Sequence, residues 1–106
     1  MVIKYNADIN IDAIEANLKR ITNQVYKLLP SREEGSDWKK PLSTLLEELS
    51  GMDRLLIGEH EILFPLLCKL EGLFILTQEE DFFLFRRTIF ECLSLINDLT
   101  NHVKLR

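Results

Sequence analysis

Apolar side chains recur every three or four positions along most of the chain, which is the pattern of helices that bury one face. The pattern predicts helices at approximately residues 10–29, 37–56, 62–75 and 78–104. No pair of alternating apolar and polar segments is joined by a hairpin turn. We therefore expect a single all-α domain, an antiparallel four-helix bundle with a long C-terminal helix.

Capping residues predict where the first and last of these helices begin. Asn10 is a candidate N-cap for the first helix, and a capping box of Asp12 with Glu15 is the alternative. Thr77 and Glu80 have the spacing of a capping box in front of the last helix.

Proline and glycine residues predict where helices end. Pro30 is expected to end the first helix, because the residue before a proline is pushed out of the helical region. Gly51 either ends the second helix or is tolerated, in which case the helix continues to about residue 56; Gly58 is a second candidate break, and Gly72 suggests a close approach between helices. Residues 1–9 are left for a short strand or an ordered arm.

The last predicted helix carries more apolar side chains than one buried stripe accommodates. Its stripe would bury Phe82, Phe85, Ile89, Cys92, Ile96, Leu99 and Val103. Outside that stripe lie Phe83, Leu84, Phe90, Leu93 and Leu95. Either this helix is central and buried on most sides, or its outer face is an interface, most simply that of a homodimer.

Composition limits the classes of function. The 106 residues are 46% hydrophobic and 28% charged, which excludes a disordered chain. The net charge of −4 argues against a nucleic-acid or anionic-membrane binder, because Lys and Arg supply affinity for phosphate. Charged residues interrupt the most apolar stretch, residues 55–76, so we expect no membrane span and a cytoplasmic location.

Acidic residues are concentrated in the middle third of the sequence. Residues 47–81 carry nine acidic and two basic side chains. Such a segment either presents a surface to a basic partner or forms a solvated polar face.

The two cysteines, Cys68 and Cys92, both lie within apolar helical patterns. We expect two reduced thiols in the core, with no disulfide. The two histidines, His60 and His102, show no metal-binding or catalytic spacing.

Five carboxylates form a candidate metal site. Glu47 and Glu48 precede Asp53, and Glu91 and Asp98 lie seven residues apart on one face of the last helix. Carboxylate oxygens of this kind are the ligands that Mg²⁺ prefers.

This arrangement is similar in part to all-α nucleotide pyrophosphohydrolases, whose pattern is Glu-Glu-x-x-Glu followed further on by Glu-x-x-Asp. The chain departs from both halves, because Gly51 stands at the third acid of the first and Ser94 at the acid of the second. The resemblance implies a Mg²⁺-dependent nucleotide hydrolase, and the departures count against it.

The function that the sequence favours is that of a small non-enzymatic protein-interaction module, without a cofactor, that acts as a homodimer. Its size and acidity are those of accessory or inhibitory factors of phages and mobile elements. The polar stretch from Pro30 to Trp38 is a further place to seek a functional surface, with the indole either an exposed anchor or part of the core. The interface candidates are Trp38, Phe83, Leu84, Arg86, Arg87 and Phe90.

Overall fold

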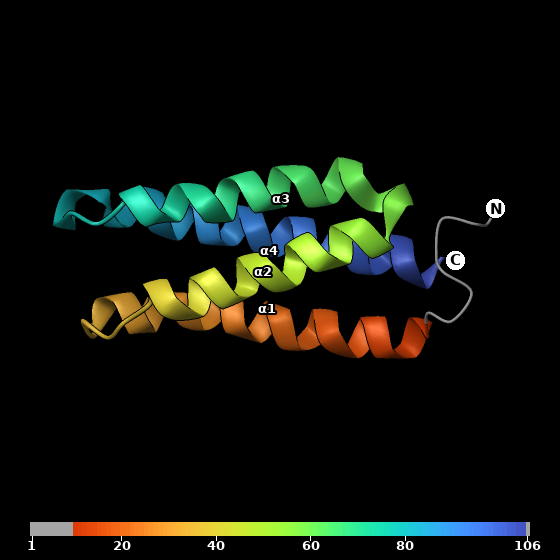
Figure 1. Cartoon of the computed structure of the whole chain (residues 1–106). Coiled ribbons are helices and arrows are strands. Elements are labelled where there is room, and N and C mark those ends of the chain that lie inside the picture. The colour runs from red at the N-terminus through yellow and green to blue at the C-terminus, as the bar shows by residue number, and fades with distance from the viewer. Residues whose placement is uncertain (1–9, 106) are drawn as a thin grey trace.

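The computed structural model describes residues 10–105, and these residues fold almost entirely as helix (Figure 1). The α-helices are α1 (Ile11–Glu33), α2 (Lys39–Leu55), α3 (His60–Gly72) and α4 (Phe82–Lys104). Short 3₁₀ turns lie between them: η1 (Ile57–Glu59), η2 (Leu73–Ile75) and η3 (Glu79–Asp81). The described residues contain no strand, so the all-α prediction is confirmed. The strand or arm predicted for residues 1–9 falls outside the described residues.

The four α-helices lie alongside one another in an elongated body of 46 × 20 × 19 Å. In Figure 1 the α1–α2 and α3–α4 connections lie at one end of this body and the α2–α3 connection lies at the other. Each of α1 and α3 contacts both α2 and α4.

One apolar core runs along the centre of the body. Residues from all four α-helices contribute to it, and the stripe predicted for the last helix is buried in it from Phe85 to Val103. Phe85 is among its largest fully buried side chains. Leu93 and Leu95, which lie outside the predicted α4 stripe, are partly buried against this core.

Helix α1 begins as predicted and ends later than predicted. The Asn10 side chain accepts hydrogen bonds from the backbone N–H groups of Asp12 and Ala13, at 2.9 and 3.4 Å, so Asn10 is the N-cap. The prediction that Pro30 ends the helix is wrong, because α1 continues to Glu33. Pro30 lies in the last turn of the helix, which ends instead where Gly35 takes a φ of 76°.

The predictions made for the glycines fare differently. Of the two alternatives for Gly51, the structure shows the one in which α2 continues through it to Leu55, and Gly58 falls in the break between α2 and α3, in η1. The close helix approach expected at Gly72 is wrong, since a Cβ added there would meet no atom within 4 Å.

The remaining helix starts differ from prediction by a few residues. Helix α3 begins at His60 rather than near residue 62. The capping box before α4 is formed by Gln78 and Asp81, one position after the predicted pair, with the Gln78 N–H donating to the Asp81 carboxylate at 3.1 Å. Among the described residues, no helix is long and apolar enough to cross a membrane.

Candidate interaction surface on helix α4

Helix α4 has one buried face and one exposed face that also carries large apolar side chains. The buried face packs Phe85, Ile89, Cys92, Ile96, Leu99 and Val103 into the core. On the outside, Phe83 is 76% exposed and Phe90 is 43% exposed. Leu84 is exposed as well. Of the five apolar residues that the sequence placed outside the buried stripe, Phe83, Leu84 and Phe90 are exposed. The other two, Leu93 and Leu95, are partly buried.

Phe90 is the centre of a small aromatic cluster. Tyr26 of α1, which is 54% exposed, meets the Phe90 ring edge-on with the ring centroids 6.4 Å apart. The Arg86 guanidinium lies 5.2 Å from the centroid of the same ring. This distance is within the range of a cation–π contact. A shallow groove of about 440 Å³ runs along α4 beside the cluster, lined by Phe83, Arg86, Arg87, Phe90, Glu91 and Ser94.

The two neighbouring arginines of α4 have different partners. Arg87 pairs with Glu91 one turn later, at 3.6 Å from Nε to Oε2. Glu91 also pairs with Lys69 of α3, at 3.2 Å. The charge of Arg87 is therefore partly offset by Glu91, while Arg86 lies over an aromatic ring. We refer to Tyr26, Phe83, Arg86, Arg87 and Phe90 as the aromatic–arginine surface.

Trp38 is not part of this surface. Its indole is buried and meets the Phe85 ring edge-on at 5.0 Å. The Lys39 ammonium lies 5.7 Å from the centroid of the indole. Of the two interpretations that the sequence left open for Trp38, the structure shows the core position.

The stretch from Pro30 to Trp38 contains one well-anchored residue that the sequence did not single out. Arg32 donates to the backbone carbonyl of Leu76 from Nε and Nη2, and to that of Gln78 from Nη2 at 2.7 Å. Its guanidinium lies 4.9 Å from the Phe85 centroid and 5.3 Å from that of Phe82. Arg32 thus ties the end of α1 to the α3–α4 connection, and no local sequence signal indicates this role.

Three of the five carboxylates proposed as Mg²⁺ ligands pair with a basic side chain instead. Glu48 pairs with Arg20 of α1, and this hydrogen bond raises the pKa of the guanidinium. Asp53 accepts from His60 at 2.9 Å. Glu47 and Asp98 are exposed, and Glu91 binds the cations described above. Within residues 10–105, the structure brings together no group of three or more His, Cys, Asp or Glu side chains that could hold a metal ion.

One buried acid was missed by the sequence analysis. Glu59 is almost fully buried, and its carboxylate lies 3.5 Å from Nδ1 of His102 in the last turn of α4. Nothing in the local sequence distinguishes Glu59 from its exposed neighbour Glu61, because the contact joins segments 43 positions apart.

The two cysteines occupy different environments. Cys92 is buried, and burial raises the pKa of its thiol to about 12. Cys68 is exposed on α3, so the prediction of two core thiols is wrong for this residue. Neither forms a disulfide.

The chain matches no protein-family model, and comparisons with curated proteins and with solved structures gave no match.

Proposed function

We propose that the chain is an antiparallel four-helix bundle that acts as a non-enzymatic protein-interaction module in the cytoplasm. The observation that carries this proposal is the aromatic–arginine surface. Three aromatic side chains remain exposed there beside an arginine, although the same chain buries a large core elsewhere. Aromatic residues and arginine are the types enriched at the centres of protein interfaces.

The partner that we propose is a second copy of the chain. A two-fold axis places the same patch of both copies in contact, so one exposed surface is sufficient to build the complex. Of these aromatic side chains, Phe83 would bury the most apolar surface on dimer formation, since most of it is exposed to solvent in the single chain. The accessory or inhibitory role expected from the sequence then belongs to the dimer.

The test is the molar mass in solution at tens of micromolar, measured by sedimentation or light scattering. Wild-type protein is expected to be a dimer, and the Phe83→Ser/Phe90→Ser double variant a monomer with an unchanged helical circular dichroism spectrum. Phe64→Ser is the matched control, because Phe64 is 55% exposed but lies on α3. A wild-type monomer, or a dimer that the double variant leaves intact, contradicts the homodimer.

A second measurement separates the dimer from the wider proposal. Immobilised wild-type protein and the same double variant are compared for proteins retained from an extract of the native host. A stoichiometric partner that the double variant loses, found with a monomeric wild type, supports an interaction module with a different occupant. A partner retained equally by both forms contradicts the aromatic–arginine surface as the binding site.

A further inference from the structure

The helical path that leads into α4 begins with two exposed acids. Glu79 and Glu80 lie in η3, which passes directly into α4. In the part of the chain that the structure describes, neither carboxylate pairs with a basic side chain. The third acid of η3, Asp81, differs, because its carboxylate accepts the Gln78 N–H in the capping box. Two negative charges at this end of α4 are therefore left without an ion pair.

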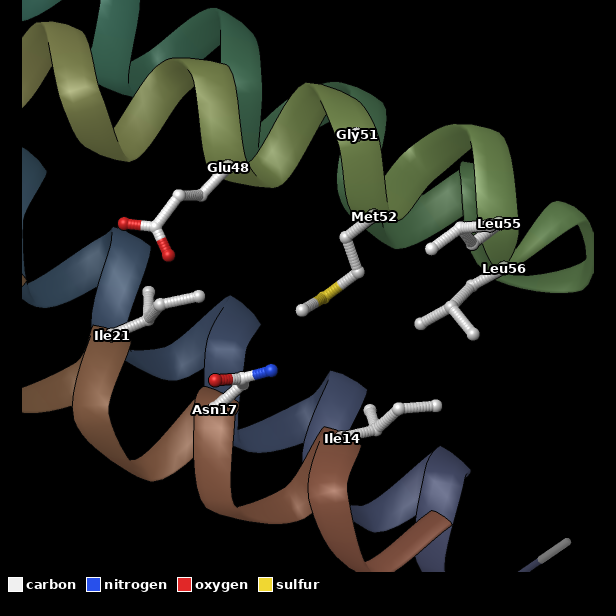
Figure 2. Close-up of a pocket in the computed structure, with 8 residues that line it drawn as sticks. All are labelled: Ile14, Asn17, Ile21, Glu48, Gly51, Met52, Leu55 and Leu56. Carbon is white, nitrogen blue, oxygen red and sulfur yellow. The ribbon is translucent and has the colours of Figure 1, made fainter. Parts of the chain in front are cut away.

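Elsewhere the fold pairs acids that lie between its helices. Figure 2 shows the Glu48 side chain reaching from α2 toward α1, and its carboxylate pairs with Arg20 of α1. Glu91 of α4 pairs with Lys69 of α3 in the same way. Since the two exposed acids of η3 have no such pairing within residues 10–105, a basic group that meets them comes from outside the single chain.

The charges on this face of the helix repeat with a spacing of seven residues. Glu79 precedes Arg86 by seven positions, and Glu80 precedes Arg87 by the same number. Positions seven apart lie on the same side of a helix, because seven residues make nearly two turns. The tighter 3₁₀ winding of η3 shifts the acids by less than one residue's rotation. The exposed face is thus acidic before Phe83 and basic after it.

Both arginines keep donors for a further acceptor. A guanidinium has five N–H donors. Arg86 lies over the Phe90 ring, a contact that engages no oxygen acceptor. Arg87 directs Nε toward Glu91, which leaves its two Nη groups. Each arginine can therefore bind a carboxylate of a second molecule while it keeps the contact that it already makes.

Charge selects among the ways in which two copies can pair through α4. A parallel pair places each residue beside its own copy, so arginine meets arginine and acid meets acid. An antiparallel pair centred at the arginines brings those of both copies together. An antiparallel pair centred at Phe83 places Glu79 of one copy beside Arg86 of the other, because each lies a similar distance from the axis on the same flank. On the opposite flank it places Glu80 beside Arg87. Of these three arrangements, the last alone pairs opposite charges.

We propose that two copies pair antiparallel through the start of α4, with the two-fold axis at Phe83 and the acids of η3 in each copy bound to the arginines of the other. This inference rests on the proposed homodimer and states which residues of the second copy meet the aromatic–arginine surface. Phe83 then packs against its own copy. Phe90 lies about 10 Å further along α4, level with the α3–α4 connection of the other copy, where Ile75 is 79% exposed. The acidic surface considered from the sequence thus has the second copy as its basic partner.

The test reverses the charges in the full-length protein and measures the dissociation constant of the dimer by sedimentation. Glu79→Lys/Glu80→Lys and Arg86→Glu/Arg87→Glu are each expected to weaken the wild-type dimer by about tenfold or more, since every pair becomes repulsive. The quadruple variant is expected to recover the wild-type value, because opposite charges again face each other. An equimolar mixture of the two double variants should form a heterodimer for the same reason.

Glu61→Lys is the matched control, because Glu61 is also an exposed acid in the first turn of its helix but lies on α3. It should leave the dissociation constant unchanged, and all variants should keep the helical circular dichroism spectrum. If Glu79→Lys/Glu80→Lys dimerises as tightly as wild type, or if neither the quadruple variant nor the mixture recovers, the antiparallel pairing at Phe83 is overturned while the homodimer stands. A wild-type monomer overturns both.

The shape of the wild-type dimer gives an independent test. A single chain is 46 Å long, and Phe83 lies near one end of α4, so two copies centred there overlap only near their ends. Small-angle X-ray scattering from the dimer is expected to give a longest dimension well beyond 46 Å. A dimer no longer than the single chain has its copies side by side and overturns the proposed pairing.

Discussion

Arg32 is expected to be the strongest single polar contributor to the stability of the fold. It closes one end of the helical body, where its guanidinium donates to the carbonyls of Leu76 and Gln78. The same group stacks on Phe82 and Phe85. A hydrogen bond from a charged donor contributes about 1.5–3 kcal/mol, and a cation–π contact about 0.5–1 kcal/mol near the surface.

Arg32→Ala removes all of these contacts at once, although the Gln78 carbonyl still accepts from the Asp81 N–H at 3.0 Å. Because such contributions are not additive, we expect a loss of about 2–4 kcal/mol in the free energy of unfolding. Arg32→Lys keeps the charge but loses the planar fork that serves two carbonyls, so it should lose about half as much. Arg86→Ala is the control, since Arg86 is exposed and loses only its cation–π contact with Phe90, so its change should not exceed about 1 kcal/mol.

The assay is equilibrium unfolding in urea, with the slope m compared between variants so that a change in midpoint reports stability. At a typical slope of about 1–3 kcal/mol per molar urea, the Arg32→Ala midpoint should fall by on the order of 1 M or more. If Arg32→Ala and Arg86→Ala lower stability equally, the contacts at the end of α1 do not hold the α3–α4 connection in place.

Three further predictions concern the core and the helices. Phe85→Ala should cost about 3–5 kcal/mol in thermal or urea unfolding, because the ring is fully buried; a cost under about 1 kcal/mol contradicts the packing described. Gly51→Ala should raise stability by about 1 kcal/mol, since the added Cβ comes no closer than 3.9 Å to Arg54; a loss of stability refutes this. The buried Cys92 thiol, with its pKa raised from 9.0 to about 12, stays protonated in the folded state while the unfolded chain ionises, so stability should fall as pH rises from about 9 to about 12. Cys92→Ala should weaken that dependence, and a thiol reagent should modify Cys68 in the folded protein but not Cys92.

The helices and their buried faces were predictable because a repeat of three and four positions is a local property of the sequence. In α4 the predicted stripe is buried from Phe85 to Val103, and its first member, Phe82, is partly buried. The helix ends were less predictable. Local propensity predicts that α1 ends before Pro30. The last turn is nevertheless helical, and Arg32 in that turn makes hydrogen bonds to the α3–α4 connection that a local pattern does not reveal.

The candidate surface could be located in part from the sequence. The apolar surplus indicated α4 as the helix with an exposed apolar face, and it indicated Phe83 and Phe90. It did not indicate Tyr26, because the contact between Tyr26 and Phe90 depends on how α1 and α4 are rotated about their axes when they pack together. The aromatic character of Trp38 suggested an anchor, yet the edge contact with Phe85 places the indole in the core.

The carboxylates considered for a metal site show why the spacing of residues on one helix is insufficient evidence for a site built from several helices. Positions three, four or seven apart share a face, but convergence of two helices depends on how each is rotated about its axis. Here the rotation brings Glu48 to Arg20 and Glu91 to Lys69, so these acids form ion pairs between helices. Because Glu91 is taken up in an ion pair, α4 presents no cluster of carboxylates on its outer face. What remains exposed there are the rings of Phe83 and Phe90, which have no role in the core of a single chain.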